Sequence, residues 1–219
     1  MSLALYMHPF ASFCMKVLVA LYENDAPFEK IVVDLGDERS RNAFLAVWPA
    51  GKFPVLRDSE APRVIPESTI IIEYLDRKFP GRTRLVPADP DEALRTRLFD
   101  RFFDTYVQNP MQKIVGDRLR PANHRDRFGV DEARASLRTA YGILEADIAG
   151  KEWAMGDAFT MADCAAAPAL HYADLVEPLT PGFPNAAAYL QRLKARPSFA
   201  RTLDEAQPYF HNFPKEETS

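Results

Sequence analysis

Two short segments in the first third of the chain combine the residue types and backbone demands of a ligand-binding site. The first, residues 51–56, enters an apolar run through Pro54, and the second, residues 65–68, precedes a helical pattern of apolar residues. Proline has no amide hydrogen to donate inside a strand, so Pro54 is expected to begin one. A cis Phe53-Pro54 bond would free the Phe53 amide and carbonyl for an extended partner, whereas a trans bond would make an ordinary strand start.

The second segment could receive an anionic group. Ser68 stands directly before the helical pattern that includes Ile71 and Leu75, so it is placed to cap a helix. The first amides of a helix point outward with partial positive charge and favour a bound carboxylate. The alternative is that Ser68 is only a cap and Glu67 only a first-turn acid. Together, a free amide and carbonyl beside such a helix start suit a small peptide-like ligand.

The other residue types that carry chemistry are scattered along the chain. The two cysteines, Cys14 and Cys164, have no CxxC or metal-type spacing, and the histidines are also dispersed, at His8, His124, His171 and His211. Neither a disulfide framework nor a zinc site is therefore expected. Cys14 falls on a helical stripe that should be buried, together with Val17, Leu18 and Leu21. This spacing counts against Cys14 as a solvent-facing nucleophile.

The composition is that of a soluble globular protein. Of the 219 residues, 47% are hydrophobic and 26% are charged, and the formal net charge is -4. The acidic balance gives no electrostatic reason to expect nucleic acid as a partner. No apolar stretch approaches the ~20 residues of a membrane span, and the N-terminus does not read as a signal peptide. A cytoplasmic location without a membrane partner is expected.

The first 81 residues are expected to form an α/β layer. A strand is predicted over Leu3–Met7, a helix over Ser12–Glu23, and a second strand over residues 28–33. The two strands should be parallel because a helix connects them. Another helix, a hairpin over residues 54–57 and 63–65, and a helix from Ser68 follow, which is the order of a thioredoxin-like domain.

After a linker at residues 80–90, the strand signals vanish. A capping acid and proline at Asp89-Pro90 predict a helix start, and Asn109-Pro110 is expected to kink or end that helix. Thr160 and Asp163 form a capping-box pattern at the start of a further helix, with Asp in place of the usual Glu. Two shorter helices are predicted near residues 184–195 and 197–205.

In this order and spacing, the motifs resemble those of the glutathione transferase superfamily. WPAGKFPVL resembles its NP-x-G-x-VP-x-L element, PESTIIIEYL its ES-x-x-I-x-x-YL element, and GDAFTMAD the start of the core helix of its second domain. The resemblance covers nearly the whole chain. It implies a thioredoxin-like, glutathione-binding domain at residues 1–81, an all-α helical-bundle domain at residues 90–213, and a homodimer.

The resemblance also implies how glutathione would be held. Lys52 would face the glycyl carboxylate, and the backbone of Phe53, joined to Pro54, would pair with the cysteinyl unit. Glu67 and Ser68 would hold the γ-glutamyl end, whose ammonium and carboxylate suit an acid beside a helix start. Lys52 could instead be an exposed surface lysine.

A hydrophobic co-substrate would lie against the second domain. The side chains expected to line its site are Phe10, Phe102, Tyr106 and Met111. Core packing is the alternative for those in the second domain.

Ser12 is the predicted catalytic residue. A free thiol has a pKa near about 8.5, and only the thiolate attacks an electrophile. A hydroxyl that donates to the sulfur contributes roughly 1.5 to 3 kcal/mol, and a helix N-terminus adds up to ~1 kcal/mol. Ser12 can supply both because it stands at the start of the first predicted helix. The alternative role is a helix cap without a ligand.

The neighbours of Ser12 match no single class of relatives. When the chain is aligned on Lys16-Val17, the catalytic hydroxyl of many serine-type relatives falls on Ala11, and the nucleophile of the cysteine-type relatives falls on His8. Tyr6 lies in the first predicted strand, where burial is expected rather than catalysis.

The sequence therefore favours a glutathione transferase that conjugates glutathione thiolate to a hydrophobic electrophile. Glutathione would be the co-substrate, and no metal is expected. Three alternatives stay open: a non-catalytic glutathione-binding member of the fold, glutathione-dependent thiol exchange, and isomerisation of a maleyl-type substrate.

Overall fold

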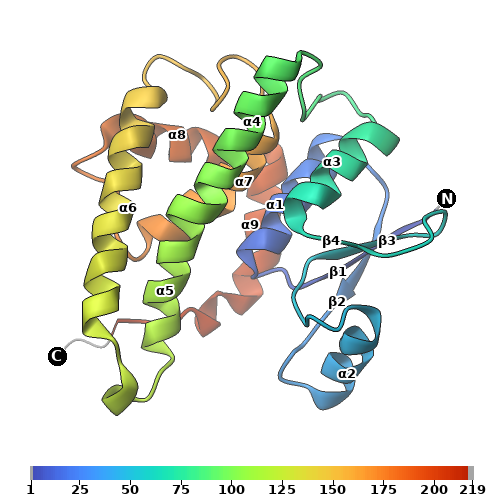
Figure 1. Ribbon diagram of the computed structural model, residues 1–219, viewed down its shortest axis with the longest axis horizontal. Coiled ribbons are helices and arrows are strands. Elements are labelled where there is room, and N and C mark those ends of the chain that lie inside the picture. The colour runs from blue at the N-terminus through green and yellow to red at the C-terminus, as the bar shows by residue number, and fades with distance from the viewer. Residues whose placement is uncertain (1, 217–219) are drawn as a thin grey trace.

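The computed structural model describes residues 2–216 and has two parts, a small sheet with three helices and a larger all-helical part. Figure 1 shows the sheet at one side of the molecule and the long helices α4, α5 and α6 at the other. The predicted fold class, a thioredoxin-like α/β domain followed by a helical bundle, is confirmed. We propose the expected boundaries, 1–81 and 90–213, for the two domains.

The sheet has four strands in the order β2-β1-β3-β4. β1 (Leu3–Met7) pairs in parallel with β2 (Glu29–Val32), as predicted for two strands joined by a helix. β3 (Val55–Asp58) runs antiparallel to β1, and β4 (Ile65–Pro66) runs antiparallel to β3. The predicted hairpin is therefore confirmed, with its first strand shifted by one residue and its second strand beginning at Ile65 rather than at Arg63.

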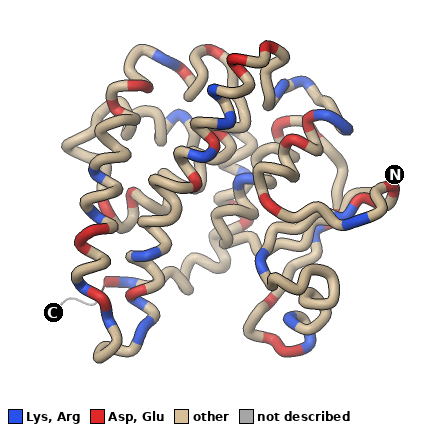
Figure 2. The backbone as a smooth tube through the Cα atoms, in the orientation of Figure 1, with Lys and Arg blue, Asp and Glu red and all other residues tan. Residues whose placement is uncertain are grey.

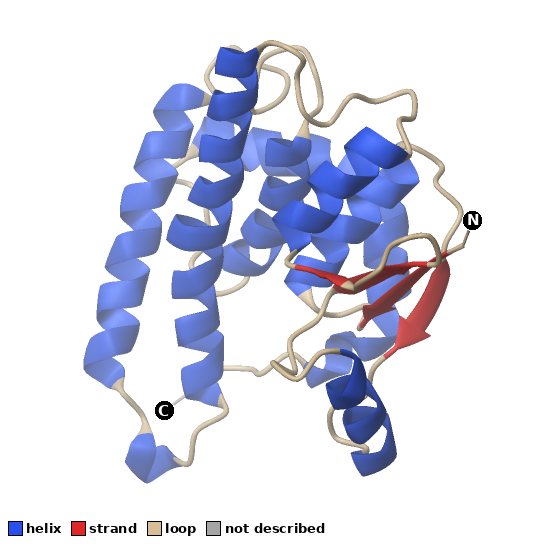
Figure 3. Cartoon of the chain, turned by 45° about the vertical axis from the view of Figure 1, so that its right-hand side comes forward, coloured by secondary structure: helices blue, strands red, loops and turns tan. Residues whose placement is uncertain are grey.

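Helices cover both faces of the sheet. α1 (Ser12–Glu23) and α3 (Ser68–Lys78) share a hydrophobic core with the helical part. α2 (Glu38–Val47) packs on the opposite face through Phe44, which forms a small separate cluster with Val33 and Val55. Figure 3 shows the strands beside the helical part, so that α1 and α3 lie between the sheet and the bundle.

The second part is all-helical, and a long connection over residues 148–160 joins two of its helices. α4 (Pro90–Phe102) continues through a π-helical segment, η1 (Phe103–Gln108), into α5 (Asn109–Arg118), so the chain does not end its helix at Pro110. The remaining helices are α6 (Arg127–Asp147), α7 (Met161–Asp174), α8 (Pro184–Ala195) and α9 (Pro197–Ala206). Two short 3-10 segments, η2 (Ala122–His124) and η3 (Gln207–Asn212), complete the described elements.

Charged residues of both signs occur along the exposed faces of the long helices. Figure 2 shows acidic and basic positions interleaved along α4 and α6, as expected for solvated faces. Within residues 2–216, no helix has the length and apolar character that crossing a membrane requires.

A buried ion pair joins the two parts. Lys16, on α1, is only 1% exposed, and its ammonium lies 2.7 Å from Asp100 Oδ1 and 2.8 Å from Asp104 Oδ2. The hydroxyl of Thr69, on α3, accepts from Lys16 and donates to Asp100. Because burial disfavours a carboxylate, the pKa of Asp104 is raised, although Lys16 opposes the shift. This network fixes α1 and α3 against α4 and η1.

Glu23 makes a second polar connection, at the other end of α1. Its carboxylate accepts two hydrogen bonds of 2.7 Å from Arg196 and one from Ser198, at the start of α9. Burial alone would raise the pKa of Glu23, but these donors more than offset it and hold the pKa below its ordinary value. The charged carboxylate is thus part of the contact between α1 and α9.

Candidate functional site

Two adjoining cavities lie where the start of α1, the turn before β3, and the α4–α5 helix meet. One, of about 540 Å³, is lined by Ser12, and the other, of about 470 Å³, by Pro54, Glu67 and Ser68. They share four lining residues, Phe13, Lys52, Phe53 and Gln112. We call the two together the interdomain cleft. The structure thus brings all six expected glutathione-binding residues to one cleft.

Ser12 is the first residue of α1, and Ala11 takes the cap position with extended backbone angles, φ -87° and ψ 122°. No side chain caps this helix, so the interpretation of Ser12 as a helix cap is wrong. Its oxygen instead accepts a hydrogen bond from the side-chain amide of Gln108. Ser12 is 8% exposed and lines the cleft at the N-terminal end of α1, where the first amides of a helix point outward.

The turn before β3 has the cis geometry that the sequence left open. The Phe53-Pro54 bond is cis, and a second cis bond joins Thr180 to Pro181. The Phe53 ring lies 6.1 Å from that of Phe44 and is half-buried. Lys52, next to it, is exposed at the point where the two cavities join.

The start of α3 differs from its prediction. Glu67 holds the cap position with φ 69° and ψ 119° and makes no side-chain cap hydrogen bond, while Ser68 is the first helical residue. The prediction that Ser68 caps this helix, with Glu67 in its first turn, is therefore wrong by one position. A non-glycine residue at such a positive φ is strained and persists only where its surroundings impose it. Ser68 is buried and lines the cleft, beside the first amides of α3.

His8 and Tyr6, two ring-bearing residues of the first strand and the loop after it, line neither cavity of the cleft. His8 is half-buried, its ring packs on Phe53 at 6.4 Å, and its Nδ1 accepts from the Phe10 amide. Burial lowers the pKa of His8, although Asp34 opposes the shift. Tyr6 is half-buried on β1 and does not line the cleft, in agreement with a structural role.

Cys14 and Cys164 are both fully buried and unpaired. Burial raises the pKa of the Cys14 thiol to about 12, despite a backbone hydrogen bond at His8 that lowers it, and burial raises that of Cys164 well above its ordinary value. A thiol held neutral in this way is a poor nucleophile. The predicted buried stripe containing Cys14 is confirmed.

We expect the native protein to react with an aromatic disulfide reagent far more slowly than free cysteine does, because neither thiol is exposed or ionised. The measurement is the release of chromophore with and without denaturant. Both cysteines should titrate promptly once the chain is unfolded. Rapid reaction of one thiol in the native protein would contradict the expectation and would favour thiol exchange.

The four residues expected to line a hydrophobic site divide into two pairs. Phe10 and Met111 line the cleft beside Ser12. Phe102 packs into the helical core, with ring centroids 5.4 Å from Phe103, and Tyr106 is 59% exposed. Neither Phe102 nor Tyr106 lines the cleft, because the helix face that carries them turns away from it.

Several lining residues escaped the sequence reasoning. Tyr172, on α7, lines the Ser12 cavity and donates from its hydroxyl to the Phe10 carbonyl at 2.8 Å. Phe213 and Pro214 cover the same cavity from the C-terminal segment. Gln108 lies at the end of the π-helical segment. The only sequence signal for its place in the cleft is that it is a polar residue in an aromatic stretch. No pattern in the sequence places these three segments together.

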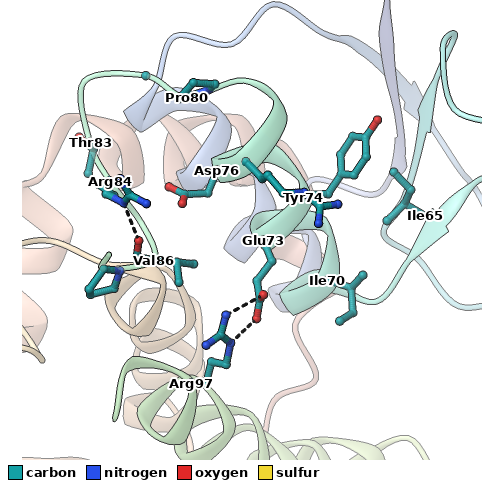
Figure 4. Close-up of a pocket in the computed structure, with 13 residues that line it drawn as sticks. Ile65, Ile70, Glu73, Tyr74, Asp76, Pro80, Thr83, Arg84, Val86 and Arg97 are labelled. Atoms are coloured by element: carbon teal, nitrogen blue, oxygen red, sulfur yellow. Dashed lines mark hydrogen bonds and ion pairs between the residues drawn. The ribbon is translucent and has the colours of Figure 1, made fainter. Parts of the chain in front are cut away.

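A wider cavity, of about 880 Å³, lies between α3, the linker and α4 and shares Ile70 with the cleft. Figure 4 shows its ion pair, in which Arg97 on α4 donates two hydrogen bonds to Glu73 on α3, at 2.7 and 3.0 Å. No serine, cysteine or histidine lines it. Across residues 2–216, no group of three or more histidine, cysteine or acidic residues is arranged to hold a metal ion.

Comparisons with known proteins match both halves of the chain. Residues 5–83 match the family described as "Glutathione S-transferase, N-terminal domain", and residues 127–192 match "Glutathione S-transferase, C-terminal domain". Glutathione S-transferase GstB of Escherichia coli K12 is 28% identical over 190 residues, which span 86% of this chain and 91% of the relative.

Two solved structures have the same fold over almost the whole chain. A glutathione S-transferase from Methylobacillus flagellatus with bound glutathione has a TM-score of 0.84 and 23% identity, covering 92% of this chain and 98% of its own. A second, from Methylobacterium radiotolerans in complex with glutathione sulfonate, has a TM-score of 0.80 and 25% identity, covering 100% and 98%.

Proposed function

Because the chain belongs to the glutathione S-transferase family, we propose that it binds glutathione in the interdomain cleft and transfers its thiolate to a hydrophobic electrophile. The observation that carries the proposal is the meeting of Ser12, the Phe53-Pro54 turn and Ser68 around one cleft. Glutathione bound in similar proteins supports the choice of ligand.

The cleft offers a complementary partner to each part of glutathione. Exposed Lys52 would attract the glycyl carboxylate, and the backbone of Phe53 would pair with the extended cysteinyl unit. The first amides of α3, at Ser68, would receive the γ-glutamyl carboxylate, and the carboxylate of Glu67 would pair with the ammonium. The strained backbone of Glu67 supports a functional constraint at this end of the cleft.

Ser12 would stabilise the sulfur as a thiolate. Its hydroxyl would donate one hydrogen bond to the sulfur, and the first amides of α1 would add a favourable field. Both stabilise the thiolate more than the neutral thiol and so lower the pKa of the thiol. The apolar wall formed by Phe10, Met111 and Tyr172 would hold the electrophile beside the sulfur. The thiolate then attacks the electrophilic carbon and forms a carbon–sulfur bond. In a substitution the bond to the leaving group breaks, and the group departs with its electron pair; in an addition the carbanion formed takes a proton from water.

The test is Ser12→Ala in a conjugation assay with an aryl halide, with the glutathione dissociation constant measured separately by calorimetry. We expect kcat to fall by about 10- to 100-fold at neutral pH, as the loss of one hydrogen bond to a charged sulfur predicts. Glutathione affinity should change little. Ser136→Ala, an exposed serine on α6, is the matched control and should keep full turnover.

Unchanged turnover in Ser12→Ala would remove Ser12 from the mechanism. Absence of glutathione binding by the unmodified protein would remove the whole proposal. Binding without turnover on a broad panel of electrophiles would instead favour a non-catalytic glutathione-binding protein.

We also propose a cytoplasmic homodimer. Four large apolar side chains are more than half exposed on neighbouring helices: Ile70, on α3, with Leu94, Leu98 and Tyr106 along α4 and η1. An exposed apolar surface of this kind supports burial against a second copy. Sedimentation analysis of the unmodified protein and of Leu98→Glu tests it, and a monomeric unmodified protein would contradict it.

A further inference from the structure

Two polar contacts, one helical turn apart, connect α1 to the π-helical segment η1. Lys16 pairs with Asp104, and Ser12 accepts from Gln108, so residues four apart on one helix contact residues four apart on the other. Ser12, Asp104 and Gln108 are 8%, 5% and 2% exposed. A buried polar contact is directional. The Lys16–Asp104 ion pair, one helical turn away, therefore helps to keep the Gln108 amide opposite the Ser12 hydroxyl.

A serine hydroxyl has one proton to donate and two lone pairs with which it accepts. The Gln108 amide nitrogen donates to the Ser12 oxygen and so occupies one lone pair. The single hydroxyl proton then remains free to point at another acceptor. A donor bound to the oxygen also polarises the O–H bond and strengthens the hydrogen bond that this proton makes.

We propose that Gln108 is a positioning residue that aims and strengthens the Ser12 hydroxyl as a donor to the glutathione sulfur. This inference rests on the proposed function of the cleft. Gln108 acts through Ser12 and is not assigned a contact with the reacting atoms.

Two further features of Gln108 support this role. Its side-chain oxygen is buried and has no hydrogen-bond partner among the described residues. An unpaired buried carbonyl is unfavourable, so an apolar side chain of similar shape would suit the same place better for stability alone. Gln108 also ends a π-helical segment, a distortion that is frequent at functional sites.

The test measures the pKa of the thiol of bound glutathione, from the ultraviolet absorbance of the thiolate against pH. The proteins are the unmodified chain, Ser12→Ala, Gln108→Met, and the double variant. Methionine has nearly the shape of glutamine but cannot donate. We expect Gln108→Met to raise the pKa of the bound thiol by about half a unit to one unit, and to lower kcat at neutral pH by about three- to tenfold. Turnover at high pH should recover.

The double variant shows whether Gln108 acts through Ser12. In the Ser12→Ala background, Gln108→Met should leave the thiol pKa unchanged. Gln191→Met, the same substitution at an exposed position on α8, controls for general effects, and glutathione affinity and the melting temperature report on folding. Gln108→Leu provides a second apolar variant should the methionine variant be poorly folded.

The outcomes separate this inference from the proposed function. A thiol pKa that Ser12→Ala does not change would contradict the role of Ser12 itself. A pKa raised by Ser12→Ala but unchanged by Gln108→Met would overturn only the role of Gln108. A pKa lowered by Gln108→Met would also overturn it, because the amide oxygen would then compete with the sulfur for the hydroxyl proton.

Discussion

Replacement of Lys16 by methionine is expected to lower the free energy of unfolding by about 3 to 5 kcal/mol, because it removes the counter-charge of buried Asp100 and leaves Asp104 paired only with the more exposed Arg101. Asp100 is 0% exposed and Asp104 is 5% exposed, and the Lys16 ammonium lies within 2.8 Å of both. The measurement is urea-induced unfolding at neutral pH. Lys78→Met, at an exposed position on α3, is the matched control and should change stability by less than about 0.5 kcal/mol.

The free energy of unfolding that Lys16→Met loses should depend on pH. The pKa of Asp104 already lies above its ordinary value of 3.8 because of burial, and loss of Lys16 raises it further. The folded variant then binds more protons than the unfolded chain, so its stability falls as the pH rises above the ordinary aspartate value. The deficit should therefore be smaller in acid than at neutral pH.

Neutralisation of the carboxylates should restore much of the lost stability. In the triple variant Lys16→Met, Asp100→Asn and Asp104→Asn, no buried charge is left unpaired. We expect it to be more stable than Lys16→Met alone. A loss below about 1 kcal/mol in Lys16→Met would mean that the ion pair does not hold α1 against α4 and η1.

Asp163→Ala is expected to lower the free energy of unfolding by a similar amount, about 3 to 5 kcal/mol. The carboxylate is fully buried, and it accepts from the backbone of Ala154 and Thr160, each at 2.8 Å, and from the Tyr189 hydroxyl at 2.6 Å. It therefore joins the start of α7, the preceding loop and α8. Burial raises the pKa of Asp163, and these donors oppose the shift.

The measurement is again the unfolding free energy, with Asp157→Ala as the control. Asp157 is an exposed acid in the same loop, so its loss should change stability by less than about 0.5 kcal/mol. Asp163→Asn keeps one acceptor oxygen and should lie between the two. Equal stability of Asp163→Ala and the unmodified chain would show that the capping box is dispensable.

Sequence reasoning succeeded where local signals agreed. The helical stripe through Cys14 and Leu18 located α1 at the observed bounds, and a capping acid followed by proline located the start of α4. The capping box at Thr160 is present in the structure. Each of these signals is local, because its residues lie within the helix or at its first turn. Such a signal can be read from the sequence without knowledge of tertiary contacts.

The predictions were wrong where tertiary packing determines the position of a residue. The cap positions of α1 and α3 fall on Ala11 and Glu67 rather than on the adjacent serines, whose side chains line the cleft instead. Phe102 and Tyr106 lie side by side, with ring centroids 5.7 Å apart, as their spacing predicts, but neither lines the cleft. The contact between Ser12 and Gln108 spans 96 residues, so no local pattern reveals it.

The measurement that tests the central claim most directly is a crystal structure of the protein with glutathione bound. The account predicts the sulfur within hydrogen-bonding distance of the Ser12 oxygen, the glycyl carboxylate at Lys52, and the γ-glutamyl carboxylate at the first amides of α3. Glutathione bound outside the interdomain cleft, or bound within it with its sulfur turned away from Ser12, would contradict the account.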